Sequence, residues 1–178
     1  MPSYVGFLRA INLGAKRTFP KDAIRSCLEG SGMTEVETYI NTGNVRFTTT
    51  MRSRARIETL LEESFLADRG FEVPTMVFTP AEILDVADDA EDLAMGHPNV
   101  LAHYITLYKR PPAAAAVAAL ADSSYDGEVV HVRDRAAHVL LLKNFHEAKV
   151  LNSKQFAALG TGTARNVTVI RAVAEKWC

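Results

Sequence analysis

The sequence predicts a mixed α/β (α+β) protein built from two ferredoxin-like halves, and three observations support this prediction. Strand-like and helix-like segments follow one another in the order β-α-β-β-α-β over residues 1–79. The order β-α-β-β returns after residue 80, and the pattern becomes helical from Phe145 onward. We therefore expect two domains, 1–79 and 80–178, packed together as βαββα(β) halves, with C-terminal helices in the second.

In the first half, apolar alternation over residues 4–10 predicts a strand that ends near Arg9. Pro20 is suited to the first turn of a helix, and Gly32 marks its end. Further elements are expected as strands at 36–40 and 45–49, a helix that Ser53 caps and Gly70 ends, and a strand at 73–78.

In the second half, the capping box Thr79-Pro80-Ala81-Glu82 predicts a short helix through Val86 and Ala87. The acidic run over residues 85–92 then indicates a solvated helix end and a linker. Further elements are expected as a strand at 101–109, an alanine-rich helix after residue 112, two strands flanking residues 134–135, a short helix at 152–159, and a final helix beginning at 163–166.

Composition restricts the class of protein. A chain of 178 residues with 48% hydrophobic residues can bury a substantial core, and no apolar run is long enough to span a bilayer. The first ten residues lack the pattern of a secretory signal, and Cys27 and Cys178 show no Cys-x-x-Cys spacing. We therefore expect a cytoplasmic protein with free thiols and no membrane association.

The net charge of −1 argues against bulk electrostatic capture of nucleic acid. A local basic patch near the N-terminus stays open, because Arg9, Lys16, Arg17 and Lys21 lie close together in the sequence. Nucleic-acid binding is therefore less favoured than binding of a small molecule.

The segment LGTGTARN, residues 159–166, combines two glycines with Thr163, Arg165 and Asn166. Glycines let a backbone approach a ligand, and an arginine fork together with a helix N-terminus favours an anion such as phosphate or carboxylate. The alternative is that Gly160 ends one helix, Gly162 makes a turn and Thr163 caps the next helix.

Two further loops carry polar residues that suit a binding site. In residues 8–17, Arg9, Asn12 and Lys16 would face an anionic or amide-bearing ligand, or they are solvated residues of a surface loop. In residues 41–44, Thr42, Gly43 and Asn44 predict an Asx-type turn with Gly43 at positive φ when they are considered alone.

The histidines suggest a weaker hypothesis. If residues 134 and 135 form a two-residue turn, His131 and His138 face each other across a hairpin, and His103 lies on another strand. No cysteine or carboxylate stands at a metal-ligand spacing beside them, so the sequence assigns no metal. It also shows no Gly-x-Ser-x-Gly motif or other nucleophile motif, and catalytic residues and cofactor stay unassigned.

Three stretches together resemble the bacterial domain-of-unknown-function family 1697. The family's motif Leu-Arg-Gly-Ile-Asn-Val-Gly-Gly-Lys is matched at Leu8, Arg9, Ile11, Asn12, Gly14 and Lys16, with Ala10 and Ala15 in place of two glycines. The motif Thr-Tyr-Ile-Gln-Ser-Gly-Asn-Val is matched at Thr38, Tyr39, Ile40, Gly43, Asn44 and Val45. The motif Thr-x-Arg-Asn-Trp is matched at Thr163, Arg165 and Asn166, with Val167 in place of the tryptophan.

The resemblance implies two ferredoxin-like halves and no established activity. Its polar motif residues occupy loops and element ends, where packing alone rarely requires them, so we expect the three loops to converge on one ligand. The expected ligand-binding residues are Arg9, Asn12, Lys16, Thr42, Gly43, Asn44, Thr163, Arg165 and Asn166. The alternatives are an enzyme acting on the same anionic ligand, nucleic-acid recognition, and a purely structural role for these residues. The oligomeric state is not predicted.

Overall fold

The computed structural model describes all residues from 1 to 178, and the chain forms two compact units. The first unit comprises residues 1–84 and 173–178, and the second comprises residues 85–172. The boundary falls within two helices, α3 (Pro80–Gly96) and α6 (Val167–Trp177). Each unit has a sheet of its own.

The first unit contains a four-stranded antiparallel sheet in the order β2-β3-β1-β4. Its elements are β1 (Ser3–Leu8), the 3-10 turn η1 (Ala15–Arg17), α1 (Lys21–Gly30), β2 (Thr34–Tyr39), β3 (Asn44–Thr48), α2 (Arg54–Arg69) and β4 (Thr75–Phe78). The predicted β-α-β-β-α-β order is therefore confirmed, and the strand order is that of a ferredoxin-like fold.

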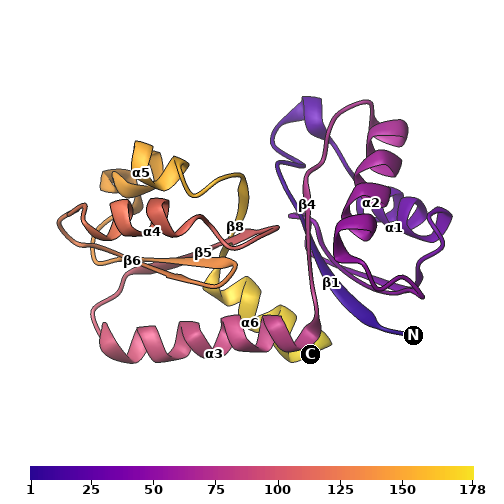
Figure 1. Ribbon diagram of the computed structural model, residues 1–178. Coiled ribbons are helices and arrows are strands. Elements are labelled where there is room, and N and C mark those ends of the chain that lie inside the picture. Colours follow the sequence, from indigo (N-terminus) through magenta and orange to yellow (C-terminus); the bar gives the residue numbers. More distant parts are fainter. The chain divides into compact units, whose positions relative to one another are not determined.

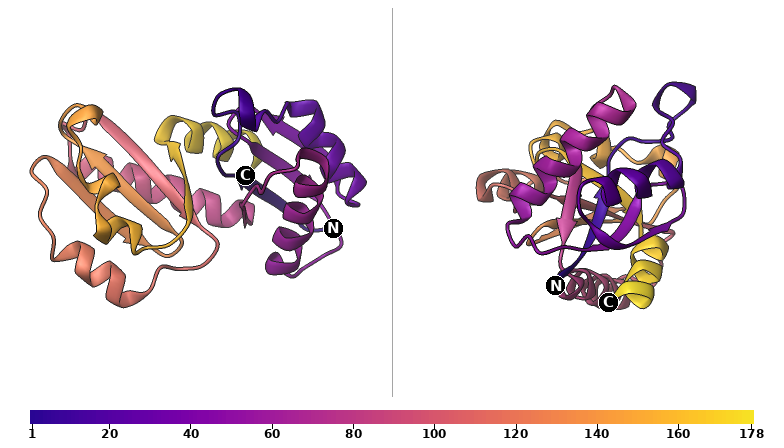
Figure 2. Two further views of the ribbon diagram at one scale, coloured as in Figure 1. Left: turned by 90° about the horizontal axis from the view of Figure 1, so that it is seen from above. Right: turned by 90° about the vertical axis from the view of Figure 1, so that its right-hand side faces the viewer.

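The helices α1 and α2 contact each other and lie on the same face of this sheet (Figures 1 and 2). Successive side chains of a strand point to opposite faces, so Tyr4 and Leu8 of β1 point to the helices. They join Phe47, Ile57 and Phe65 in one apolar core. Burial of this core stabilises the unit through the hydrophobic effect.

Carboxylates of α2 protect the edge strand β4. The outward N–H of Thr75 donates to Glu62 Oε1 at 2.8 Å, and the N–H of Val77 donates to Glu58 Oε1 at 3.0 Å. An unpaired strand edge is a template for association with another chain. The two glutamates therefore occupy donors that an additional strand would otherwise use.

The second unit repeats the topology of the first, with sheet order β6-β7-β5-β8. Besides parts of α3 and α6, it contains β5 (Ala102–Tyr108), α4 (Ala114–Ala121), β6 (Glu128–Arg133), β7 (Ala136–Leu141), η2 (Phe145–Glu147), η3 (Val150–Asn152), α5 (Lys154–Ala157) and β8 (Gly162–Asn166). Figure 1 shows α4 and α5 on one face of this sheet and α3 on the other.

The helix α3 is longer than the sequence predicts. The capping box is present, since Glu82 N–H donates to Thr79 Oγ1 at 3.3 Å and Thr79 N–H donates to Glu82 Oε2 at 2.7 Å. The helix does not stop near Ala87 but continues to Gly96, through the acidic run. Val86, Ala90 and Leu93 are buried at helical spacing, so the acidic residues lie on a continuous helix and do not form a linker.

The C-terminal segment also differs from prediction. Residues 162–166 form the edge strand β8, paired antiparallel with β5, and the last helix starts only at Val167. The helix thus begins at the end of the predicted range 163–166, and Thr163 and Arg165 belong to the strand, because these alternate residues are buried in strand fashion. None of the helices is long and apolar enough to cross a membrane. Both cysteines are free thiols, with Cys27 buried and Cys178 exposed.

A buried glutamate organises the loop before α5. The carboxylate of Glu128 accepts hydrogen bonds from the backbone N–H of Lys149 at 2.9 and 3.0 Å and of Val150 at 2.8 Å. The ammonium of Lys143 lies 3.0 Å from the same carboxylate. Burial alone would raise the pKa of Glu128, but these donors outweigh burial and hold its pKa below the ordinary value.

We predict that Glu128→Gln lowers the free energy of unfolding by about 2–3 kcal/mol at neutral pH, because the charge-assisted hydrogen bonds are weakened. A carboxylate with a lowered folded-state pKa stabilises the fold above its unfolded-state pKa. That contribution is lost as the pH falls through the folded-state pKa. Urea denaturation of both proteins from pH 7 to pH 3 should therefore show a difference that vanishes in acid, and a pH-independent difference would contradict the assignment.

Candidate functional site

The loop between β1 and α1 is organised by the side-chain amide of Asn12. Its Nδ2 donates to the carbonyl of Phe19 at 3.1 Å and to the carbonyl of Asn41 at 2.6 Å, and its Oδ1 accepts from Phe19 N–H at 2.8 Å. The backbone N–H of Asn12 donates to Arg17 carbonyl at 2.8 Å, which closes the loop. The predicted site residue Asn12 is thus engaged in holding backbone.

Arg17 supplies a second set of bonds to the same loop. Its Nε donates to the carbonyl of Ala10, its Nη2 donates to the carbonyl of Glu72 at 2.6 Å, and its guanidinium lies 4.6 Å from the ring centroid of Phe71. Sequence reasoning placed Arg17 only in a basic cluster and not in the site. In the sequence only the adjacent cations Lys16 and Arg17 pointed to this role, and their adjacency does not tell which side chain bonds to backbone carbonyls.

The loop contains left-handed backbone at positions where side chains rarely adopt it. Ala10 has φ 56° and Asn12 has φ 54°, in addition to Gly14 at φ 73°. Asparagine tolerates this region better than alanine, and at residue 10 the related family motif has glycine. Such conformations cost about 1–3 kcal/mol each, so they persist only where other contacts fix the backbone. The bonds of Asn12 and Arg17 are those contacts.

The loop between β2 and β3 carries the second set of predicted residues. Asn44 is fully buried and its Nδ2 donates to Tyr39 carbonyl and to Thr42 Oγ1, both at 3.0 Å. Gly43 has φ 79°, and a Cβ there would lie 2.7 Å from Leu8 Cβ and 2.8 Å from Ile11 Cδ1. Asn44 and Gly43 therefore shape the turn, whereas Thr42 is exposed.

The first unit brings these two motif loops together. Leu8 N–H donates to Gly43 carbonyl at 2.8 Å, and Asn12 donates to Asn41 carbonyl. Ile40, just before this contact, also has a positive φ of 50°, which is unusual for a β-branched residue. Arg9 and Lys16 are exposed on the first loop, so two cations lie on a loop that is fixed on both sides.

The third predicted motif belongs to the second unit. Arg165 is 6% exposed, and its Nη1 donates to Thr163 Oγ1 at 2.8 Å and to Ala164 carbonyl at 2.9 Å. Burial lowers the pKa of Arg165 to about 10. Asn166 Oδ1 accepts from the N–H of Thr168 at 2.9 Å, so Asn166 caps α6. The cap that the sequence suggested at Thr163 is therefore wrong, because Thr163 lies within β8.

Histidines line the face of the second sheet that α3 covers. His131 and His138 are paired across β6 and β7, as the hairpin hypothesis predicts. His103 Nε2 lies 3.2 Å from His138 Nδ1, and the two residues are 4% and 0% exposed. No group of three or more His, Cys, Asp or Glu side chains is arranged to hold a metal ion.

Comparisons with known proteins agree with this fold. Residues 1–138 match the sequence model of a family described as "Protein of unknown function (DUF1697)". The chain is also similar to a solved structure, the conserved bacterial protein SP0830 from Streptococcus pneumoniae, with a TM-score of 0.76 and 19% sequence identity over 98% of this chain and 97% of the other. At that identity the likeness concerns the fold. A comparison with curated proteins gave no match.

We predict that Asn12→Ala lowers the free energy of unfolding by about 2–3 kcal/mol, because it removes three hydrogen bonds and leaves alanine at positive φ. Asn144→Ala is the matched control, since Asn144 Oδ1 accepts one bond, from His146 N–H, at an exposed position. The control should lose less than about 1 kcal/mol. Equal losses in urea denaturation would contradict the bracing role of Asn12.

Gly43→Ala should destabilise the protein by at least about 2 kcal/mol, because the new Cβ overlaps Leu8 and Ile11 and the backbone is left-handed. Gly32→Ala provides the control, since Gly32 has φ 82° and a Cβ added there would meet no atom within 4 Å. The control carries only the backbone cost of about 1–2 kcal/mol. If thermal unfolding shows that Gly43→Ala destabilises the protein less than Gly32→Ala does, the contact of Gly43 with Leu8 and Ile11 is not tight.

Proposed function

Because the chain belongs to the DUF1697 family, whose description assigns no function, we propose from its own geometry that it binds a small anionic ligand, bearing phosphate or carboxylate, on the paired loops of the first unit. The single observation that supports this proposal most strongly is the strained, multiply braced loop that carries the exposed Arg9 and Lys16. Strained backbone concentrates at ligand-binding and active sites, where other contacts hold it.

The charge pattern of the two loops supports an anion. Residues 9–19 contain Arg9, Lys16 and Arg17 and no carboxylate, and residues 40–44 contain no charged residue at all. Arg9 and Lys16 are both exposed, so these two cations lie where a ligand would approach the loop, whereas Arg17 donates to backbone carbonyls. Two exposed cations on a loop without acids favour phosphate or carboxylate over a neutral ligand.

Preorganisation supports a binding role as well. Binding is weakened by the entropy of ordering loops and side chains, so a loop that is already fixed loses less on binding. Asn12 holds the first loop to the second, and Thr42 is oriented by the hydrogen bond that it accepts from Asn44. In this proposal Arg9, Lys16 and Thr42 contact the ligand, while Asn12, Gly43 and Asn44 hold their positions.

The third motif takes a different part in the proposal. Arg165 is buried and bonded to Thr163 and to backbone, and Asn166 is a helix cap. We therefore assign Thr163, Arg165 and Asn166 to maintenance of the second unit. Arg165→Ala is expected to lower the melting temperature of the protein, and it does not serve as a clean binding variant.

The test is calorimetric titration with inorganic phosphate, pyrophosphate and citrate at low ionic strength, with the wild type and the variants Arg9→Ala and Lys16→Ala. We expect each variant to weaken binding of at least one of these anions about tenfold or more. The melting temperature should change little, because interactions of exposed side chains contribute little to stability. Binding should also weaken as NaCl is added, since the charges are screened.

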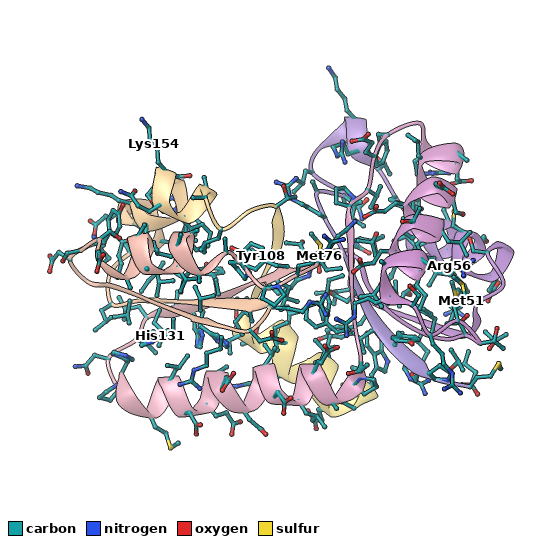
Figure 3. The ribbon with its side chains drawn as sticks, viewed as in Figure 1. Met51, Arg56, Met76, Tyr108, His131 and Lys154 are labelled. Carbon is teal, nitrogen blue, oxygen red and sulfur yellow. The ribbon has the colours of Figure 1, made fainter.

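Matched controls separate this site from general electrostatics. Arg25→Ala removes an exposed arginine of α1, and Lys154→Ala removes an exposed lysine of α5, whose side chain points away from the sheet in Figure 3. Both controls should leave the affinity unchanged. If none of the three anions binds the wild type, or if the controls weaken binding as much as the loop variants do, the proposal is wrong.

A further inference from the structure

The most unusual interior feature outside the proposed ligand site is the polar face of the second sheet. Cα pairing places His131, His138, Ile105 and Arg165 in one row across the four strands β6, β7, β5 and β8. His103, two residues before Ile105, points to the same face. Buried strand faces are normally apolar, so imidazoles in this row require an explanation.

The central pair of histidines shares one hydrogen bond. His138 Nδ1 and His103 Nε2 are 3.2 Å apart, so one of these nitrogens donates a proton and the other accepts it. The other ring nitrogen of His138, Nε2, is buried and has no hydrogen-bond partner. In the tautomer in which Nδ1 donates, Nε2 carries an unused lone pair that can accept a proton.

The groups facing the pair come from every element packed on it. They are His131 and Arg133 from β6, Asp89 from α3, Arg171 from α6 and Arg165 of β8, which lies in the same row. His97, beyond the end of α3, neighbours His131, with ring centroids 6.1 Å apart. Asp89 is the only one of these groups whose charge favours a protonated His138. At present its carboxylate forms an ion pair with Arg133.

We propose that His103 and His138 form an acid-sensitive latch, in which uptake of a proton by the pair draws Asp89 from Arg133 to His138 and so shifts the α3 segment 85–96 on the sheet. The proton binds at the unpartnered Nε2, and the resulting imidazolium requires an acceptor that the interior does not otherwise provide. Figure 3 shows His131, which is paired with His138, on the side of the sheet that faces α3.

The sign of the pH dependence follows from the pKa values. Burial, with the nearby charge of Arg171, lowers the pKa of His103 to about 4, and burial together with His103 lowers the pKa of His138 to about 4. An unfolded histidine titrates near 6.5. The latched form is therefore fully stable above about pH 6.5 and loses stability progressively as the pH falls toward 4.

The experiment is a pH titration of the 15N-labelled full chain from pH 7.5 to 4, followed by NMR. Imidazole 15N signals report protonation of each ring, and backbone amide signals report each element. We expect the amides of residues 85–96 to change together with the His138 ring, while those of α1, α2 and α4 stay in their native positions. Simultaneous change of all elements would indicate global acid unfolding and overturn the proposal, as would a titrating His138 with unchanged α3 amides.

Variants make the test specific. His138→Gln removes the titrating ring and should abolish the α3 transition, whereas His146→Gln, the same change at an exposed histidine, should leave it intact. Arg133→Gln releases Asp89 and removes a repelling cation, so it should move the midpoint to higher pH. A midpoint that does not move in Arg133→Gln would rule out the exchange of partners by Asp89, even if His138→Gln failed to fold.

Discussion

Buried backbone groups of irregular segments need hydrogen-bond partners, and the structure of the two motif loops depends on how that need is met. The side chain of Asn12 satisfies both polar groups of Phe19 and also the carbonyl of Asn41. One short amide therefore fixes the exit from β1, the entry to α1 and the neighbouring loop. Ala10 and Ile40 can adopt left-handed backbone only because the loops around them are held in this way.

The same solution recurs wherever regular hydrogen bonding stops. Glu62 and Glu58 satisfy the outer edge of β4, and Glu128 satisfies the backbone at Lys149 and Val150. Acidic residues that would ordinarily be solvated are thus part of the framework. In the ferredoxin-like pattern each half has two sheet edges and long connections, so such side-chain acceptors are needed repeatedly.

Periodicity alone was sufficient to predict most of the elements and their order, because alternating strands and striped helices have distinct spacings. It was insufficient at β8, where two glycines and Arg165 in the sequence suggest a loop although the segment is a strand. It was also insufficient at α3, because Ala90 and Leu93, which are buried, lie among the residues of the acidic run. In both cases tertiary packing decided the conformation, and packing partners cannot be identified from a short stretch of sequence.

The motif residues themselves could be identified from the sequence, but their roles could not. Asn12 and Asn44 are residue types that often bind ligands, yet their side-chain amides donate to backbone carbonyls. Whether such an amide faces a ligand or the backbone depends on partners up to 29 residues away in the sequence.

In the proposed site, Asn12 holds the two loops in place and the exposed cations Arg9 and Lys16 bind the ligand. It is tested most directly by mapping amide chemical shifts of the 15N-labelled protein as inorganic phosphate is added. Saturable changes confined to residues 9–17 and 40–44, which disappear in Asn12→Ala while that variant remains folded, are the predicted result. Saturable changes located elsewhere, or changes that persist unaltered in Asn12→Ala, would contradict a ligand site preorganised by this side chain.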